Sequence, residues 1–230
     1  MQPEFWHDKW ERNEIGFHQE SINQYLRDHW ERLGLAHAEP VFVPLCGKSQ
    51  DLLWIQEKGH PVLGVEISPL ACRAFFAEAG MDPEITTEGA FTRYRCEDIS
   101  LLCGDFFALT ADHVSDIGAV YDRAALIALP TELRERYAEH LQAITPNGAR
   151  VLLVTLEYPQ ADMQGPPFSV SEAEVQQLFE PRFEVQLIHR NELGRDDPFA
   201  KRRGLTDMWE KVFVLSRKAI GSGSEGRNER

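Results

Sequence analysis

An acidic residue follows a short apolar run in this sequence, at a spacing that suits the binding of a ribose. The run at residues 61–66 ends at Glu66, nineteen residues after Gly47. Gly47 lies in the turn Pro44-Leu45-Cys46-Gly47-Lys48-Ser49, which follows another apolar run at residues 41–45. In a doubly wound sheet, ligands bind at the carboxyl ends of the strands, where a carboxylate can accept hydrogen bonds from both ribose hydroxyls. The pattern therefore predicts a site for a nucleoside-bearing cofactor.

The turn lacks the glycines that polyphosphate cofactors require. A dinucleotide site needs GxGxxG so that the pyrophosphate can approach backbone amides, and this turn has Gly47 as its one glycine. The phosphate loop GxxxxGK[ST] is also missing, because no glycine precedes Gly47 by five residues. A nucleoside without a polyphosphate remains, and S-adenosylmethionine fits. The spacing alone leaves open that Glu66 is a solvated acid at a strand end and Gly47 an ordinary turn glycine.

Strand-like and helix-like segments alternate along the chain, which predicts the fold that positions this site. We expect strands at residues 41–45, 61–66, 101–104, 117–121 and 151–156, and helices at 21–33, 49–59, 68–80, 130–144 and 172–179, with Ser21 capping the first helix. This alternation favours an α/β fold with a doubly wound, mostly parallel sheet. Strand-like stretches at 183–188 and 208–215 predict an antiparallel edge hairpin, joined by a polar loop that carries Lys201-Arg202-Arg203.

The composition indicates a soluble globular protein and excludes several functions. The 230 residues are 43% hydrophobic, which is enough to form a core. The formal net charge of −13 repels polyanions, so we expect no nucleic-acid partner. No apolar run reaches the roughly 18–20 residues that cross a bilayer, and no secretory signal is recognisable, so we expect no membrane partner. The four cysteines form no CxxC pair, which argues against zinc and fits a reducing cytoplasm, and we expect no metal site.

Five blocks of sequence, in order and without a large gap from about residue 5 to residue 216, resemble the thiopurine S-methyltransferase family. They comprise Phe5-Trp6 with Lys9-Trp10, GFHQE at 16–20, PLCGK at 44–48 with GH at 59–60 and GVEIS at 64–68, YDRAAL at 121–126, and WEK at 209–211. The resemblance implies a class I S-adenosylmethionine-dependent methyltransferase with a Rossmann-like fold and an N-terminal helical lid. It also implies a monomeric cytoplasmic enzyme of detoxification.

The resemblance assigns cofactor-binding roles to single positions. Trp10 matches the tryptophan that covers the cofactor, Leu45 the position whose backbone meets the methionine moiety, and Glu66 the ribose acid. Asp105 and Phe106 occupy the positions that contact the adenine, although they depart from the serine and aliphatic residue of better-known members.

The resemblance also implies an acceptor side of the site. Arg123 matches an arginine near the cofactor carboxylate and the substrate pocket, and Arg202 one at the mouth of that pocket. Trp6 and Phe17 would line an apolar lid over a flat acceptor.

The implied reaction transfers a methyl group to the sulfur or selenium of a small aromatic or heterocyclic thiol such as a thiopurine, and releases S-adenosylhomocysteine. Such thiols and selenols are substantially ionised near neutral pH, so the enzyme mainly has to align donor and acceptor. Arg123 and Arg202 are the candidate catalytic residues, because a cation near the acceptor stabilises its thiolate. Two alternatives stay open: a detoxifying methyltransferase for selenium or tellurium species, and a non-catalytic S-adenosylmethionine-binding sensor.

These interpretations divide the chain into a single methyltransferase domain and a tail. We expect the domain to span residues 1–217, with the lid and entry helix at 1–38 and the sheet core at 39–217. No linker rich in Gly, Pro or Ser divides it. The low-complexity tail at 218–230 is expected to be disordered or a remnant of cloning.

Overall fold

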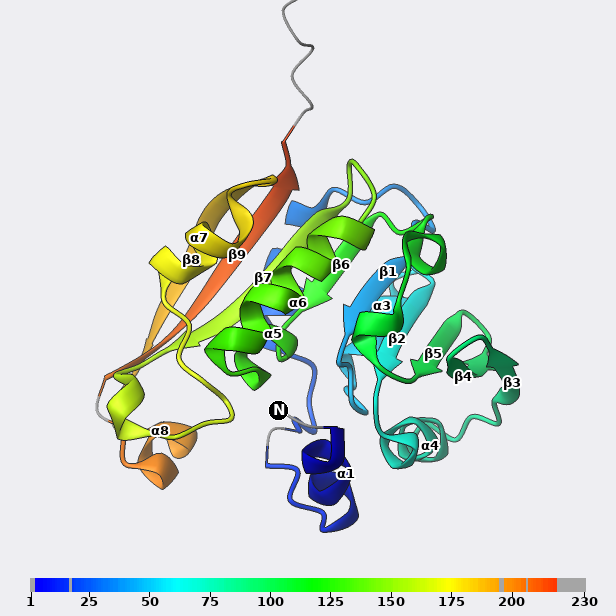
Figure 1. The fold of residues 1–230 in the computed structure, drawn as a ribbon, viewed down its shortest axis with the longest axis horizontal. Coiled ribbons are helices and arrows are strands. Elements are labelled where there is room, and N and C mark those ends of the chain that lie inside the picture. Colours follow the sequence, from blue (N-terminus) through cyan, green and yellow to red (C-terminus); the bar gives the residue numbers. More distant parts are fainter. Residues whose placement is uncertain (1–2, 17, 195–196, 206, 219–230) are drawn as a thin grey trace, which may run out of the picture.

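A nine-stranded mixed sheet forms the centre of the computed structural model, which describes residues 3–16, 18–194, 197–205 and 207–218 (Figure 1). The strands lie in the order β3-β4-β5-β2-β1-β6-β7-β9-β8. Strands β5, β2, β1, β6 and β7 pair in parallel, whereas β9 runs antiparallel to both β7 and β8. The bounds are β1 Val41–Pro44, β2 Val62–Glu66, β3 Glu84–Glu88, β4 Phe91–Cys96, β5 Ile99–Cys103, β6 Ala119–Asp122, β7 Arg150–Glu157, β8 Phe183–Leu193 and β9 Met208–Arg217.

Helices cover both faces of the sheet. The α-helices are α1 Pro3–Glu11, α2 Gln24–His29, α3 Asp51–Glu57, α4 Pro69–Glu78, α5 Ala125–Ala128, α6 Thr131–Ile144, α7 Glu172–Phe179 and α8 Pro198–Arg203. Short 3₁₀ segments are η1 Trp30–Leu33, η2 Phe106–Ala108, η3 Ala111–Val114 and η4 Gln160–Asp162. None of the helices in the described ranges is both long and apolar enough to cross a lipid bilayer.

Two hydrophobic clusters, one on each face, hold these layers together. Side chains alternate between faces along a strand, so Phe42 packs in the cluster with α5, α6 and α7, while Val41 and Val43 pack in the cluster with α2, α3 and α4. The same alternation recurs along β7. Because both faces are covered, the central parallel strands are apolar at nearly every position, which made them recognisable in the sequence.

The structure confirms the predicted mostly parallel sheet with its antiparallel edge, but several predicted elements were wrong in detail. The antiparallel strands β3 and β4 extend the other edge of the sheet, and β3 was not predicted. Strand β3 is polar and exposed, as is common at sheet edges, so it has no apolar signal.

Two further corrections concern short helices. The expected helix at 21–33 is split into α2 and η1, and its cap is Asn23, whose side chain accepts a hydrogen bond from the backbone of Tyr25. The basic triplet lies in helix α8 rather than in a loop. Asp197 caps this helix and Pro198 begins it, a combination that favours helix formation.

The chain crosses from one half of the sheet to the other at β1. It runs outward through β2 to β5 and then returns to β6, on the opposite side of β1. The carboxyl ends of β1 and β6 therefore mark the switch point at which doubly wound sheets bind ligands. Figure 1 shows α1, α4 and α8 gathered at this end of the molecule.

The predicted division at residues 38 and 39 and the single-domain boundary at 217 stay predictions. The helices α1 and α2 and the segment η1 precede the first strand, β1. Of the predicted tail, all residues after Lys218 lie outside the described ranges.

The packing around β2 yields a test of the fold. A methyl group added at Gly64 would lie 2.5 Å from Leu101 Cδ2 and 2.7 Å from Cys46 Sγ. We expect Gly64→Ala to reduce the free energy of unfolding by about 1–3 kcal/mol, since overpacking a core strains it. The measurement is thermal denaturation, where each kcal/mol lowers Tm by about 2–4 °C in a chain of this size. Gly194→Ala is the control, because its added carbon meets no atom within 4 Å. Equal melting of the two variants would contradict the packing described here.

Candidate active site

The turn after β1 has a strained backbone that brings its peptide groups to the switch point. Leu45 has a φ of +48° and Gly47 a φ of +55°. A left-handed conformation is costly for leucine and is typical of functional sites, whereas glycine adopts it freely. The turn is held by a hydrogen bond from the Cys46 amide to the Val65 carbonyl oxygen, at 3.0 Å. The residue predicted to meet the methionine moiety through its backbone, Leu45, therefore lies at the switch point.

Glu66 connects this turn to the start of helix α4. Its side chain is 6% exposed, and its two carboxylate oxygens accept hydrogen bonds from the Gly47 amide at 2.9 Å and the Ser68 amide at 2.8 Å. A carboxylate has about four acceptor positions, so each oxygen keeps one for a ligand hydroxyl. Burial raises the pKa of Glu66 to about 7, against the opposing effect of the backbone amides of Ser68, Gly47 and Ile67. The geometry allows the predicted ribose contact, and that role stays a prediction.

Helix α1 places an indole ring against the same turn. Trp10 is buried, and a methyl group added at Gly47 would lie 3.3 Å from its Cζ2 atom. Glycine at this position thus leaves room for the ring to approach the backbone of the turn. Trp6, also on α1, is half-buried. Its ring lies edge-on to that of Phe5, with 5.2 Å between the two ring centroids. Phe17 lies outside the described residues, so the apolar lid stays a prediction.

Arg123 immediately follows β6 and reaches the turn from the other side of the switch point. Its side chain is 15% exposed, and Nη2 lies 3.6 Å from Asp51 Oδ2 and donates to Ser49 Oγ at 3.5 Å. His18 lies close enough for the cations Lys48 and Arg123 to lower its pKa, although burial is the larger cause. The structure therefore gathers Arg123, the turn and the segment after α1 in one place.

Arg202 lies on helix α8, at the same end of the molecule as α1 (Figure 1). It is exposed on α8, and its Nε donates to the Pro198 carbonyl oxygen of the same helix at 3.2 Å. A small hydrophobic cluster that includes Tyr158, Met163 and Ala200 packs α8 against the loop after β7. Arg202 is thus carried by a fixed helix, and its predicted contact with substrate stays a prediction.

Asp105 and Phe106, the residues predicted to contact the adenine, follow β5. Asp105 is exposed, and its side chain accepts a hydrogen bond from the Phe107 amide at 2.9 Å, so it caps η2. Phe106 is buried, with its ring centroid 4.8 Å from that of Tyr137 and 5.2 Å from that of His140. These contacts give Phe106 a place in the core, and the adenine contacts of Asp105 and Phe106 stay predictions.

Sequence reasoning missed Asp51, which is buried beside Arg123. Asp122 is buried and accepts hydrogen bonds from the Ala125 amide at 3.0 Å and the Tyr137 hydroxyl at 2.7 Å, so it holds α5 and α6 to β6. Among the residues that the structure describes, no three His, Cys, Asp or Glu side chains form a group able to hold a metal ion.

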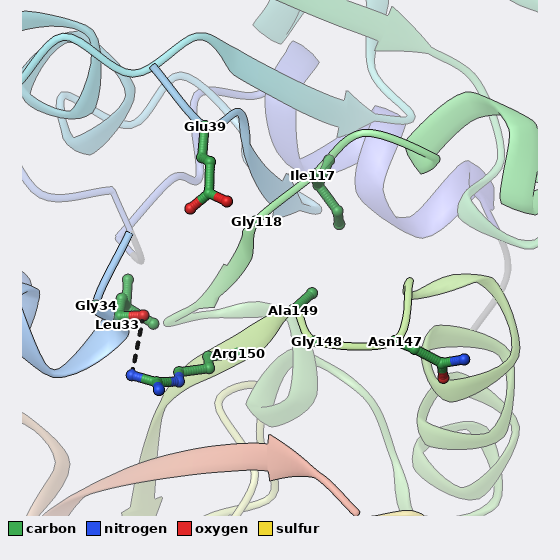
Figure 2. Close-up of a pocket in the computed structure, with 9 residues that line it drawn as sticks. All are labelled: Leu33, Gly34, Glu39, Ile117, Gly118, Asn147, Gly148, Ala149 and Arg150. Carbon is green, nitrogen blue, oxygen red and sulfur yellow. Dashed lines mark hydrogen bonds between the residues drawn. The ribbon is translucent and has the colours of Figure 1, made fainter. Parts of the chain in front are cut away.

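A polar cavity of about 260 Å³ lies at the opposite end of the sheet, before β6 and β7 (Figure 2). Arg150 lines it and donates to the carbonyl oxygens of Arg32 at 3.2 Å and Leu33 at 3.3 Å, which secures the end of η1. Glu39, also in the lining, accepts a hydrogen bond from the Ala36 amide at 2.7 Å. These groups stabilise the protein's own turns, and we assign the cavity no part in the site.

Comparison with known proteins decides the family. The sequence profile of the family "Thiopurine S-methyltransferase" matches residues 1–218. This chain belongs to the thiopurine S-methyltransferase family. The thiopurine S-methyltransferase of Marinobacter nauticus is 47% identical over 219 residues, which cover 95% of this chain and 100% of the relative. The thiopurine S-methyltransferase of Pseudomonas fluorescens is 50% identical over 215 residues, which cover 94% of this chain and 99% of that relative.

Solved structures of low sequence identity support the fold. An S-adenosylmethionine-dependent methyltransferase from Anabaena variabilis matches with a TM-score of 0.65 at 14% identity, covering 94% of this chain and 95% of that one. A second match is a 1,6-didemethyltoxoflavin-N1-methyltransferase from Burkholderia thailandensis, solved with bound 1,6-didemethyltoxoflavin and S-adenosylhomocysteine. Its TM-score is 0.64 at 15% identity, and the match covers 94% of this chain and 87% of that one. The chain therefore has the S-adenosylmethionine-dependent methyltransferase fold that its sequence predicted.

The pKa of Glu66 predicts how pH affects the stability of the ligand-free protein. The Glu66 carboxyl group has a pKa of about 7 in the native protein and a pKa of 4.5 in the unfolded chain. Between these pH values the native state therefore binds more protons than the unfolded state. Ionising Glu66 therefore costs stability as pH rises through this window, by about 3 kcal/mol in total. We compare the unfolding free energy of the wild type with that of Glu66→Gln. The difference, wild type minus variant, should decrease as the pH rises from 5 to 8. Urea denaturation at several pH values measures this difference, and a constant or rising difference would show that the buried carboxyl is not destabilised.

Proposed function

We propose that this protein transfers a methyl group from S-adenosylmethionine to the sulfur or selenium of a small aromatic or heterocyclic thiol or selenol, with thiopurines as representative acceptors. The observation that carries the proposal is the meeting of Glu66, the strained turn at Leu45 and the cation of Arg123 at one switch point. Membership of the thiopurine S-methyltransferase family supports the choice of acceptor.

The residues at the switch point fit this cofactor. Glu66 has an acceptor position left on each oxygen, which suits a ribose diol, and the turn beside it exposes backbone rather than a phosphate cradle. Trp10 packs on Gly47 and would exclude water from that side. When bound, S-adenosylmethionine supplies a methyl group on a sulfonium that a soft nucleophile can displace.

Arg123 and Arg202 act on the acceptor in this proposal. A guanidinium within hydrogen-bonding reach stabilises a thiolate, and a mostly buried one does so more strongly because water screens it less. Arg123 has that environment, whereas Arg202 is exposed and needs a bound acceptor to cover it. No strong general base is required, because an aromatic thiol ionises near neutral pH, and alignment supplies several kcal/mol of the barrier reduction.

The cellular setting forms part of the same proposal. A cytoplasmic location is supported by the four cysteines, which are free thiols in the structure. A monomeric state and a detoxifying role rest on the resemblance to the family.

Arginine substitutions test the reaction. Replacing either guanidinium removes a charge-assisted hydrogen bond, worth about 1.5–3 kcal/mol, so Arg123→Ala and Arg202→Ala should each lower kcat/KM for a thiopurine by at least tenfold. Lys201→Ala is the control for Arg202, because it removes one positive charge from the same exposed helix. The assay is transfer of a labelled methyl group. Wild-type turnover in both arginine variants would contradict the electrostatic role, and absence of transfer to any thiol or selenol by the wild type would favour a binding-only sensor.

A further inference from the structure

A buried carboxylate, Asp51, lies at the first position of helix α3, directly after the turn that follows β1. The residue is 1% exposed. An acid in the first turn of a helix is common on protein surfaces, where it interacts with the helix dipole. A buried charge, in contrast, requires partners, because removing it from water costs several kcal/mol. The partners of Asp51 therefore show what its charge does.

Its two oxygens are bound by groups from separate parts of the chain. Oδ1 accepts a hydrogen bond from the Asn23 amide at 2.8 Å, at the start of α2. Oδ2 accepts one from the Tyr121 hydroxyl at 3.1 Å, on β6, and lies 3.6 Å from Nη2 of Arg123. Asp51 thus links the segment that follows the N-terminal helix to the arginine of the acceptor side.

Two other acids, Asp122 and Glu210, interact electrostatically with Arg123, but of these three acids only Asp51 lies within 4 Å of the guanidinium. Asp122 accepts from the Tyr137 hydroxyl at 2.7 Å, and Glu210 accepts from the Tyr25 hydroxyl at 2.6 Å. The contacts of the Arg123 guanidinium with Asp51 and Ser49 both use Nη2. Asp51 is therefore the acid that holds the Nη2 end of the guanidinium.

We propose that Asp51 is a positioning residue that holds Arg123 in place for the acceptor, and that it ties this placement to the docking of the segment at Asn23. The inference rests on the proposed function, in which Arg123 stabilises the acceptor thiolate. It differs from a purely structural role, because its effect on turnover passes through Arg123.

A double-mutant cycle tests this proposal on the full chain. Asp51→Asn keeps the volume of the side chain and an oxygen for the Asn23 amide, but it removes the ion pair with Arg123. We expect it to lower kcat/KM for a thiopurine by about tenfold in the wild-type background, and to have no further effect in an Arg123→Met background. Tyr121→Phe is the comparison variant: it removes a hydroxyl that interacts with both Asp51 and Arg123 but keeps the charge of Asp51, and it should change turnover by less than Asp51→Asn does. Asp51→Glu, which restores the charge, should recover part of the loss.

The outcomes separate this inference from the proposed function. Additive losses in the cycle, or wild-type turnover in Asp51→Asn, would overturn the positioning role while the effect of Arg123→Met stands. Wild-type turnover in Arg123→Met would instead overturn the role of Arg123 itself. If Asp51→Asn does not fold, as judged by thermal denaturation, Asp51→Ser takes its place in the cycle, with the same expected results.

Discussion

The pairing of the Glu66 carboxylate with the amides of Gly47 and Ser68 is the interaction on which the rest of the site depends. It joins the turn after β1 to the start of α4, so the carboxyl ends of two neighbouring strands are fixed relative to each other. Burial raises the pKa of this group to about 7, because the ionised carboxylate is less stable in these buried surroundings than in water.

The other elements at this end of the sheet are arranged around that pairing. The left-handed conformations of Leu45 and Gly47 shape the turn that Glu66 holds, and Trp10 packs on the glycine from α1. Arg123 approaches the same turn through Ser49 and Asp51. The N-terminal segment reaches Asp51 through the Asn23 amide, so this segment, the turn and Arg123 belong to one hydrogen-bonded framework.

Much of this could be predicted from the sequence, for identifiable physical reasons. Residues 41–45 and 151–156 are apolar because both faces of their strands are buried, and Glu66 interrupts such a run at a strand end. The edge strand β3 could not be predicted, because its exposed polar residues carry no hydrophobic pattern. Asp51 looked like an ordinary first-turn acid, since its burial depends on Tyr121 and Asn23, which are distant in sequence. The packing of Phe106 could not be predicted either, because its aromatic partners Tyr137 and His140 come from α6.

In the proposed site, Glu66 binds the cofactor through the acceptor positions that its amide partners leave free. Calorimetric titration with S-adenosylhomocysteine, on the wild type and Glu66→Ala and at a pH above 7 where the carboxyl group is ionised, measures this contact. Glu84→Ala serves as the control, because Glu84 is an exposed acid on the edge strand β3. We expect Glu66→Ala to lose at least tenfold in affinity, because it removes a charge-assisted hydrogen bond worth about 1.5–3 kcal/mol. Glu84→Ala should keep wild-type affinity. Unchanged affinity in a folded Glu66→Ala variant would contradict it.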